Sequence, residues 1–339
     1  MKFKNKIILI TGGTGSFGKE FVKFALKNYD FKKIIIFSRD EMKQYDMRNS
    51  FSKKDNTKLR FLIGDIRDKE RLMFAMENVD IVIHAAALKQ VDTAEYNPFE
   101  AVKTNIMGSQ NVIEASLSNN VDKVIALSTD KASSPVNLYG ASKLTADKLF
   151  VSANNYKGRK KTLFSVVRYG NVFGSRGSVL PLFLNQKKQN IFTVTDNRMT
   201  RFSITLSSAV NFVFSSLINM QGAEIFIPKL YSYNIIDVVK AISLKPKINI
   251  IGLRPGEKLH EEMISSSASN QILEFNNYYV VLPDSNYLDY NEKNRYFKNL
   301  KNKKFKKIKE NFNYNSLENK NYLKVKDIKK LIKDFIRFS

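Results

Sequence analysis

The sequence predicts an α/β fold, with a doubly wound parallel sheet and a smaller C-terminal lobe. In the first half of the 339-residue chain, short apolar runs rich in β-branched residues alternate with helix-like stretches. Such runs are typical of parallel strands buried on both faces, and right-handed crossovers between them give a doubly wound sheet. The predicted strands are 6–11, 33–38, 59–64, 79–87, 122–129 and 162–172. The clearest helices between them are 17–27, 98–118 and 138–154.

The alternation weakens after residue 172, which predicts a change of domain. We expect residues 1–172 to form the first domain, with a return of the chain to it at about 202–240. Segments 173–201 and 241–290 are expected to form the second lobe, and 291–339 a basic tail that ends in a helix. Within these segments we expect loops at 174–181 and 196–202 and short strands at 224–228, 248–252 and 278–283.

Composition narrows the class of protein. The chain has no Cys and only two His, which excludes disulfides and thiolate metal sites, so no metal is expected. No apolar run approaches the roughly 18 residues that span a bilayer. The four-residue apolar run near the N-terminus is also too short for the core of a signal peptide. We therefore expect a cytoplasmic protein.

The net charge of +24 at pH 7 leaves a rival class of function open. Segment 301–310 has six Lys and one Glu, and basic surfaces of this kind bind nucleic acid or anionic membranes. A general bias toward Lys and Asn on a solvated surface explains the same charge. We favour that explanation, with no nucleic-acid or membrane partner, and keep a polyanion-binding protein as a distant alternative.

A glycine-rich loop, TGGTGSFGK at 11–19, follows the first predicted strand and opens a predicted helix. In this context the spacing G-x-x-G-x-x-G is a dinucleotide-binding fingerprint. Glycine lets the backbone approach a pyrophosphate, and the helix N-terminus supplies unpaired N–H groups with a partial positive charge. The loop residues predicted to bind the cofactor are Gly12, Thr14, Gly15, Ser16, Phe17 and Gly18.

The end of the second predicted strand should hold the adenosine ribose. Ser38, Arg39 and Lys43 supply a hydroxyl and two cations, which suit a 2′-phosphate better than a bare diol, so the sequence favours NADP. Asp40 keeps NAD as the alternative. His84 is expected to be structural. The other predicted cofactor contacts are Asp65, Ile66, Ala85, Ala86, Lys89 and Thr104.

Tyr139 and Lys143 are four residues apart on a predicted helix and therefore share a face. A Lys ammonium near a phenol favours the phenolate and lowers its pKa. A phenolate can take the hydroxyl proton of an alcohol as its hydride leaves to the cofactor. Thr129, at the end of the fifth strand, can hydrogen-bond the same oxygen. We expect Tyr139 and Lys143 to contact the cofactor as well as to take part in catalysis.

With these residues the chain resembles the extended short-chain dehydrogenase/reductase superfamily, in the segments TGGTGSFG, HAAA, LST and YGASK. Within it, STDKA, NLYGASK, SVVRYGNVFGSRGSV, RMTRF and RPGEKLHE resemble the inverting UDP-N-acetylglucosamine 4,6-dehydratases, over about residues 3–275. Those enzymes begin the pathway to pseudaminic acid. The resemblance implies a Rossmann fold, an NADP-dependent lyase, a UDP-sugar substrate and a homo-oligomer.

The resemblance also implies a role for Asp130 and Lys131, which directly follow Thr129. A ketone at carbon 4 of a hexose acidifies the proton on carbon 5. Lys131, if neutral, can take that proton, and we expect burial near other cations to lower its pKa. Asp130, if protonated, can give its proton to the departing 6-hydroxyl. Which of the two is the acid and which the base stays open.

The second lobe is expected to bind the nucleotide of the substrate. A guanidinium forks onto phosphate oxygens, so a cluster of arginines after residue 170 suits a diphosphate. The resemblance implies that RPGEKLHE, at 254–261, lies beside the uridine and diphosphate. The predicted substrate contacts are Lys89, Asn171, Ser175, Arg176, Ser178, Thr195, Arg198, Arg201, Arg254 and Glu257.

Rival activities within the same superfamily stay open. They are a retaining dehydratase, a dehydratase that epimerises carbon 5 on the way to a fucosamine-type sugar, and a UDP-sugar 4-epimerase. The second subgroup often lacks the active-site tyrosine, so Tyr139 argues against it. A 4-epimerase only oxidises and re-reduces carbon 4 and needs no second acid–base pair, so Asp130 and Lys131 argue against that activity.

Overall fold

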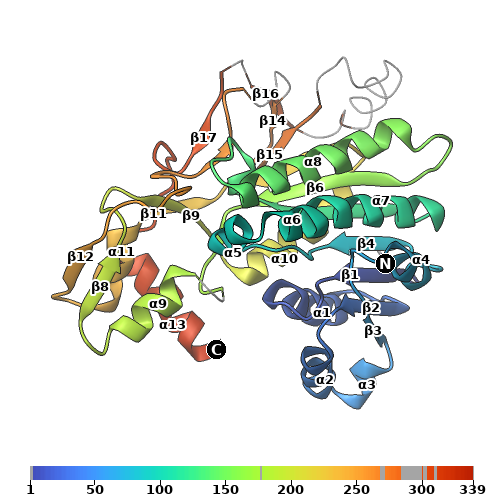
Figure 1. Ribbon diagram of the computed structural model, residues 1–339, viewed down its shortest axis with the longest axis horizontal. Coiled ribbons are helices and arrows are strands. Elements are labelled where there is room, and N and C mark those ends of the chain that lie inside the picture. The colour runs from blue at the N-terminus through green and yellow to red at the C-terminus, as the bar shows by residue number, and fades with distance from the viewer. Residues whose placement is uncertain are drawn as a thin grey trace.

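The computed structural model describes residues 3–175, 178–267, 272–283, 300, 304–308 and 311–338. Among these residues, ten strands form one sheet in the order β16-β14-β15-β10-β6-β5-β4-β1-β2-β3 (Figure 1). Between β10 and β3 all adjacent strands are parallel, which confirms the predicted doubly wound α/β fold. The parallel strands are β1 (Ile7–Thr11), β2 (Lys33–Ser38), β3 (Leu59–Ile63), β4 (Ile81–His84), β5 (Lys123–Thr129), β6 (Leu163–Tyr169) and β10 (Ile225–Pro228). The antiparallel edge consists of β15 (Tyr278–Val281), β14 (Ile272–Glu274) and β16 (Lys306–Lys307).

Helices cover both faces of the parallel part of the sheet. Successive side chains of a strand point to opposite faces, and in β1 Ile8 and Ile10 belong to one core while Leu9 belongs to the other. Helices α1 (Ser16–Asn28) and α10 (Leu206–Asn219) pack on the first face. Helices α4 (Lys69–Ala75), α7 (Gly108–Ser118) and α8 (Leu138–Tyr156) pack on the second. Burial on both faces is the reason why these strands are continuously apolar.

The sixth strand differs from the prediction of one strand at 162–172. It ends at Tyr169, and β7 (Asn171–Val172) leaves the main sheet to pair with β9 (Thr200–Ile204). The break falls at Gly170, where an added Cβ would lie 2.6 Å from Cβ of Phe202. The predicted loop at 196–202 is also partly wrong, because β9 finds backbone partners in β7 and in β11 (Tyr231–Asn234).

The predicted helix at 98–118 is interrupted. It consists of α6 (Pro98–Ala101), a π-helical turn η1 (Val102–Met107) and α7. Within η1, the Asn105 side chain donates to the Leu88 carbonyl and to Ser142 Oγ, both at 2.9 Å, and accepts from the Leu88 N–H at 2.8 Å. The π turn therefore ties the segment after β4 to helix α8.

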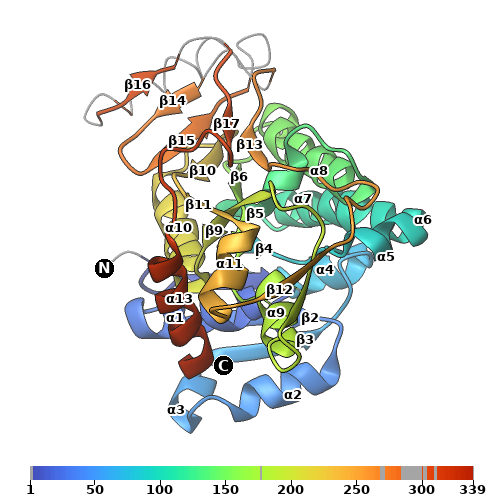
Figure 2. The same cartoon turned by 90° about the vertical axis from the view of Figure 1, so that its left-hand side faces the viewer.

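A smaller group of elements lies beside the sheet, on the left of Figure 1. Strands β8 (Ile191–Val194) and β12 (Lys247–Ile250) pair in parallel, and α9 (Val179–Gln186), α11 (Ile235–Ile242) and α13 (Val325–Phe338) share a third apolar core with β8. Figure 2 shows the predicted C-terminal helix, α13, beside α11. The other elements are α2 (Glu41–Asn49), α3 (Lys53–Asn56), α5 (Val91–Tyr96), the 3₁₀ turn η2 (Asp130–Ala132), β13 (Glu262–Ile264) and β17 (Tyr314–Asn315).

Two further expectations concern the predicted basic tail and membrane-spanning helices. Most of the predicted basic tail before residue 304, and several positions after it, lie outside the described residues. No helix in the described ranges is long and apolar enough to cross a membrane.

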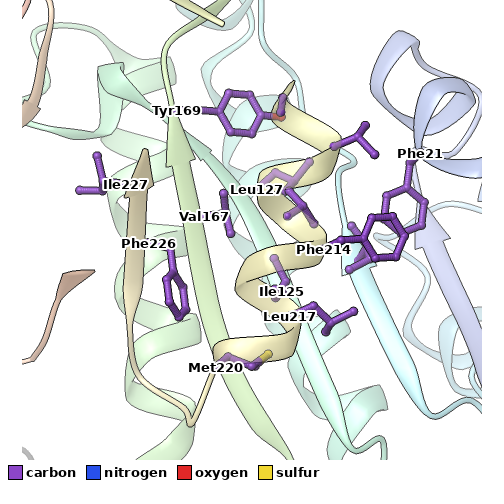
Figure 3. Close-up of a cluster of buried hydrophobic side chains, with 14 of the residues drawn as sticks. Phe21, Ile125, Leu127, Val167, Tyr169, Phe214, Leu217, Met220, Phe226 and Ile227 are labelled. Atoms are coloured by element: carbon purple, nitrogen blue, oxygen red, sulfur yellow. The ribbon is translucent and has the colours of Figure 1, made fainter. Parts of the chain in front are cut away.

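Helix α10 fixes one face of the sheet through a cluster of aromatic rings. The fully buried ring of Phe214 stacks on Phe21 of α1 with 4.7 Å between centroids, and it lies equally close to Tyr29. Figure 3 shows α10 lying across the strands, with Phe214 and Leu217 among the strand residues of the same cluster. This cluster holds α1, and with it the glycine loop, against the sheet.

We expect Phe214→Ala to lower the free energy of unfolding by about 3–5 kcal/mol, because the ring is fully buried and its removal leaves a cavity. Denaturant unfolding followed by circular dichroism measures this loss. Phe99→Ala, at a ring that is 63% exposed, is the matched control and should change stability by about 0.5 kcal/mol or less. Equal losses in the two variants would contradict the packing described here.

Candidate active site

A cleft of about 1220 Å³ opens at the carboxyl ends of the parallel strands, where ligands bind in doubly wound sheets. Each residue predicted to contact the cofactor lines this cleft, from Gly12 in the glycine loop to Lys143 in α8. Of the predicted catalytic residues, Thr129, Lys131, Tyr139 and Lys143 also line it. Asp130 is fully buried beside Lys131.

The glycine loop has the geometry that a pyrophosphate requires. Gly12 has φ +65°, and a Cβ there would lie 2.9 Å from the backbone of Ala86. Gly15 is the N-cap of α1 and contributes no side-chain cap, so the first N–H groups of the helix keep their capacity to bind an anion. The loop therefore fits a dinucleotide laid across β1 and β4.

The end of β2 brings together the residues expected at the ribose. Arg39 Nη1 lies 3.5 Å from Asp65 Oδ2. Lys43 forms an ion pair with Asp40. The hydrogen bond that the Lys43 ammonium donates to the Asp40 carboxylate lowers the pKa of Asp40. Each cation therefore has a carboxylate neighbour, with which a bound 2′-phosphate would compete.

Helix α8 presents Tyr139 and Lys143 to the cleft. Lys143 Nζ donates to the Leu127 carbonyl at 2.8 Å, and burial lowers its pKa. Burial raises the pKa of Tyr139 to about 12, while the charge of Lys131 and a hydrogen bond with Thr129 act in the opposite direction. The predicted fall in the pKa of the phenol is therefore wrong for the folded chain itself, and the cation that acts on it is Lys131.

Asp130 and Lys131 occupy the turn η2 directly after β5. Lys131 Nζ lies 3.1 Å from Asp130 Oδ1, and Thr129 Oγ1 donates to the same oxygen at 2.9 Å. Burial raises the pKa of Asp130, and although Lys131 opposes this effect, the net shift is upward. A raised pKa favours the protonated form of this carboxyl, and that form suits the role of a proton donor.

Glu261 completes this group, and the sequence interpretation missed it. Its Oε1 lies 3.1 Å from Lys131 Nζ, and its side chain is 3% exposed. Burial alone would lower the pKa of Lys131, but the carboxylates of Asp130 and Glu261 outweigh burial and raise it. The predicted fall in the pKa of Lys131 is therefore wrong. Glu261 is the last residue of RPGEKLHE, but nothing in that motif indicates that its carboxylate is buried against Lys131.

The close approach of α8 to η2 brings together the two pairs that the sequence predicts to be catalytic. At Gly140 an added Cβ would lie 2.3 Å from the carbonyl oxygen of Lys131. The Asn137 side chain caps α8 by accepting from the Gly140 N–H at 2.8 Å, and it donates to the Gly256 carbonyl at the same distance. The helix start is thereby linked to the segment that leads to Glu261.

The predicted substrate contacts are only partly brought together. Those that line the cleft are Lys89, Asn171, Ser175, Ser178, Arg201, Arg254 and Glu257. Arg176 lies outside the described residues. Thr195 and Arg198 do not line the cleft: Thr195 Oγ1 donates to Met199, and Arg198 pairs with Asp196 at 2.7 Å with 67% of its side chain exposed. Both residues belong to the irregular segment between β8 and β9, whose course the sequence pattern does not reveal.

His84 plays the structural part expected of it. The ring is buried, with Nδ1 2.9 Å from Thr11 Oγ1 and Nε2 3.3 Å from Ser109 Oγ. Burial lowers its pKa to about 3, so the ring is neutral at physiological pH. These bonds join β1, β4 and α7 beneath the glycine loop.

Comparison with known sequences assigns this site to a family. The sequence pattern of the polysaccharide biosynthesis protein family matches residues 8–283, and the chain belongs to this family. The inverting UDP-N-acetylglucosamine 4,6-dehydratase of Campylobacter jejuni is 52% identical over 332 residues, which cover 97% of this chain and 98% of the relative. The resemblance stated from the motifs is thereby confirmed.

Other similar proteins are an epimerase and two proteins of known structure. A UDP-glucose 4-epimerase of Rickettsia bellii is 46% identical over 296 residues, which cover 85% of this chain and 86% of the relative. The structure of Pen from Bacillus thuringiensis has a TM-score of 0.86 at 39% identity and covers 98% of this chain and 100% of that one. DesIV of Streptomyces venezuelae, a dTDP-glucose 4,6-dehydratase with NAD and TYD bound, has a TM-score of 0.66 at 20% identity, covering 75% and 86%, and shows the fold alone.

We expect Lys131→Met to lower the free energy of unfolding by about 3 kcal/mol at pH 8, because two buried carboxylates lose their shared cation. Burial alone would raise the pKa of Glu261, and Lys131 and Arg201 together hold it below its ordinary value, so the loss of Lys131 moves this pKa upward. The gap between variant and wild type should therefore narrow as the pH falls from about 8 to 5, since the buried carboxyls of the variant take up protons.

Urea unfolding at the two pH values measures this gap. Lys240→Met is the control, because the Lys240 side chain is 57% exposed and its ammonium lies near Asp237. This variant should change stability little at either pH. An equal loss for Lys131→Met at both pH values would contradict the ionic role of Lys131.

Proposed function

We propose that the protein is a nucleotide-sugar 4,6-dehydratase that inverts carbon 5. It converts UDP-N-acetylglucosamine to a UDP-2-acetamido-2,6-dideoxy-4-hexulose by oxidation, loss of water and re-reduction. The observation that supports this proposal most directly is the buried Asp130–Lys131 pair, because Lys131 lines the same cleft as Tyr139 and the glycine loop. The 52% identity to an inverting UDP-N-acetylglucosamine 4,6-dehydratase over nearly the whole chain gives independent support.

The cofactor is proposed to be NADP, bound by the glycine loop, with its 2′-phosphate at Ser38, Arg39 and Lys43. When bound, it supplies a hydride acceptor for carbon 4 and the donor that returns this hydride to carbon 6. Tyr139 takes the proton of the 4-hydroxyl, and Thr129 and Lys131 favour its ionised form. The 4-ketone that results acidifies the proton on carbon 5.

Elimination needs a base for carbon 5 and an acid for the 6-hydroxyl at the same time. Lys131 Nζ and Asp130 Oδ1 are 3.1 Å apart, within reach of a direct proton transfer. Transfer from the ammonium to the carboxylate produces both species at once, a neutral amine and a protonated carboxyl, with no change in net charge. The amine then takes the proton of carbon 5, and the carboxyl protonates the departing hydroxyl as water. Reprotonation of carbon 5 on the opposite face inverts it.

A 4-epimerase is the alternative activity, and a 46% identical relative bears that name. Epimerisation exchanges hydride at carbon 4 only, so it leaves the buried pair Asp130–Lys131 without a chemical task. Retention at carbon 5 would require the proton to return on the face from which it left. Four expectations stay predictions. Segments 173–201 and 241–290 form the substrate lobe, the protein is a homo-oligomer, it is located in the cytoplasm, and its product enters the pathway to pseudaminic acid.

The activity is tested by incubating the protein with NADP and UDP-N-acetylglucosamine in deuterated water. Proton NMR should detect a new methyl signal on carbon 6 and deuterium at carbon 5, with a coupling pattern for the inverted sugar. Tyr139→Phe should abolish the methyl signal, because the first oxidation lacks its base. A product with an intact 6-hydroxymethyl group would overturn the dehydratase and favour the epimerase.

We expect Arg39→Ala to raise the Kd for NADP by about tenfold or more and to change the Kd for NAD about threefold at most, because only NADP offers a 2′-phosphate to the guanidinium. Isothermal titration calorimetry with each nucleotide measures the two constants. Arg67→Ala is the matched control, since Arg67 also pairs with Asp65, at 2.7 Å, but does not line the cleft. A wild-type protein that binds NAD more tightly than NADP would contradict the NADP assignment.

A further inference from the structure

Glu261 forms a buried ion pair with Lys131 rather than an ion pair at the surface. Its carboxylate is almost fully buried, with Oε1 3.1 Å from Lys131 Nζ and 3.7 Å from Arg201 Nε. Oε2 is buried too and has no hydrogen-bond partner in the described part of the chain. Burial of a carboxylate is costly unless it is paired, and the removal of one partner of such a pair is strongly destabilising. Glu261 is therefore the buried ionic partner of Lys131 at the wall of the cleft.

The backbone of Glu261 is held in place by a distant part of the chain. Its N–H donates to Ser316 Oγ at 2.9 Å, and its carbonyl accepts from the Ser316 N–H at 2.8 Å. Ser316 is fully buried, and its hydroxyl lies 2.7 Å from Thr200 Oγ1 at the start of β9. Ser316 directly follows β17, which pairs with β13. A segment near the C-terminus, which the sequence left without a role, thus fixes the position of Glu261.

The two carboxylates beside Lys131 have unequal surroundings. Asp130 contacts Thr129 and Lys131, and its Oδ2 is buried without a partner among the described residues. Glu261 has Arg201 as a second cation, and Lys258 also acts on it. Two neighbouring carboxylates in a buried site do not both ionise easily, so the negative charge stays on the one with more cations. That carboxylate is Glu261, so a proton that leaves Lys131 passes to Asp130 rather than to Glu261.

We propose, on the basis of the dehydratase activity above, that Glu261 is a positioning residue for the acid–base pair. Its carboxylate holds the Lys131 amine at the end of β5 and reserves Asp130 as the proton donor for the departing hydroxyl. Glu261 acts through Lys131 and Asp130 and needs no contact with the sugar. Glu261, at the end of the segment that precedes β13, thereby has a task in the elimination step.

Several charged or titratable groups face this cluster from the surrounding elements, and they set the direction of the pH effect. They are Asp130 and Lys131 from η2, Tyr139 from α8, Arg201 from β9, Tyr233 from β11 and Lys258 from the loop before β13. The charge of Glu261 raises the pKa of both Asp130 and Lys131. Removal of that charge lowers both values, so Asp130 loses its proton at lower pH and Lys131 becomes neutral at lower pH.

The test is the pH dependence of dehydration in Glu261→Gln, which keeps the shape of the side chain and removes its charge. We expect kcat near pH 7.5 to fall about tenfold or more, with KM within about threefold, because an acid–base step is impaired rather than binding. Both limbs of the kcat profile should move to lower pH by about one unit. Glu261→Asp, which restores the charge, should return the profile toward its wild-type position.

Glu262→Gln is the matched control, because Glu262 is the next residue and its carboxylate accepts instead from Ser134 and Asn313. Its pH profile should coincide with that of the wild type. A Glu261→Gln variant that loses kcat with an unmoved profile, or that raises KM alone, would overturn the proposal. A wild-type protein that forms no methyl product overturns the proposed function instead. A folded-state check by thermal unfolding separates both results from misfolding.

Discussion

Lys131 places a positive charge at the wall of the cleft, and two carboxylates lie 3.1 Å from its nitrogen. Neither carboxylate is open to water, since Asp130 is fully buried and Glu261 is 3% exposed. In such surroundings the protonation of each group depends on the charges of the other two. A proton can pass from the ammonium to a carboxylate without a change in net charge. This transfer supplies together the base and the acid that the proposed elimination needs.

The cluster exists because segments far apart in the sequence end at one place. Strand β5 ends at η2, helix α8 begins beside it, and the loop before β13 reaches the same point. Close contact is possible because glycines stand where these segments meet. A Cβ at Gly140 would lie 2.3 Å from the Lys131 carbonyl oxygen, and one at Gly170 would lie 3.2 Å from Asp130 Oδ2. The geometry of the acid–base pair therefore depends on small residues that take no part in the chemistry.

The side of the cleft expected to bind the cofactor was predictable, since most of the residues predicted there directly follow strands that the apolar pattern identifies. The carboxyl ends of parallel strands meet at one edge of the sheet, so strand order alone brings Gly12, Arg39 and Ala86 together. The substrate half was less predictable. Thr195 and Arg198 belong to an irregular segment and do not line the cleft, and no periodicity specifies the course of such a segment. Glu261 was missed because its contact with Lys131 spans 130 positions of the sequence.

The pKa shifts of Tyr139 and Lys131 could not be predicted from the sequence either, because they too depend on contacts between distant segments. Spacing places Tyr139 one turn from Lys143 and Asp130 beside Lys131. The expected fall in the pKa of Tyr139 rested on Lys143, and the expected fall in the pKa of Lys131 rested on burial near other cations. The sequence by itself determined the fold class and the place of the glycine loop, and it predicted Asp130, Lys131, Tyr139 and Lys143 as the acid–base groups, because these depend on local pattern. Only the tertiary structure decided how far each group is buried and which distant charge lies beside it. Burial and long-range charge set the pKa values, so the direction of each shift became known only once the chain was folded.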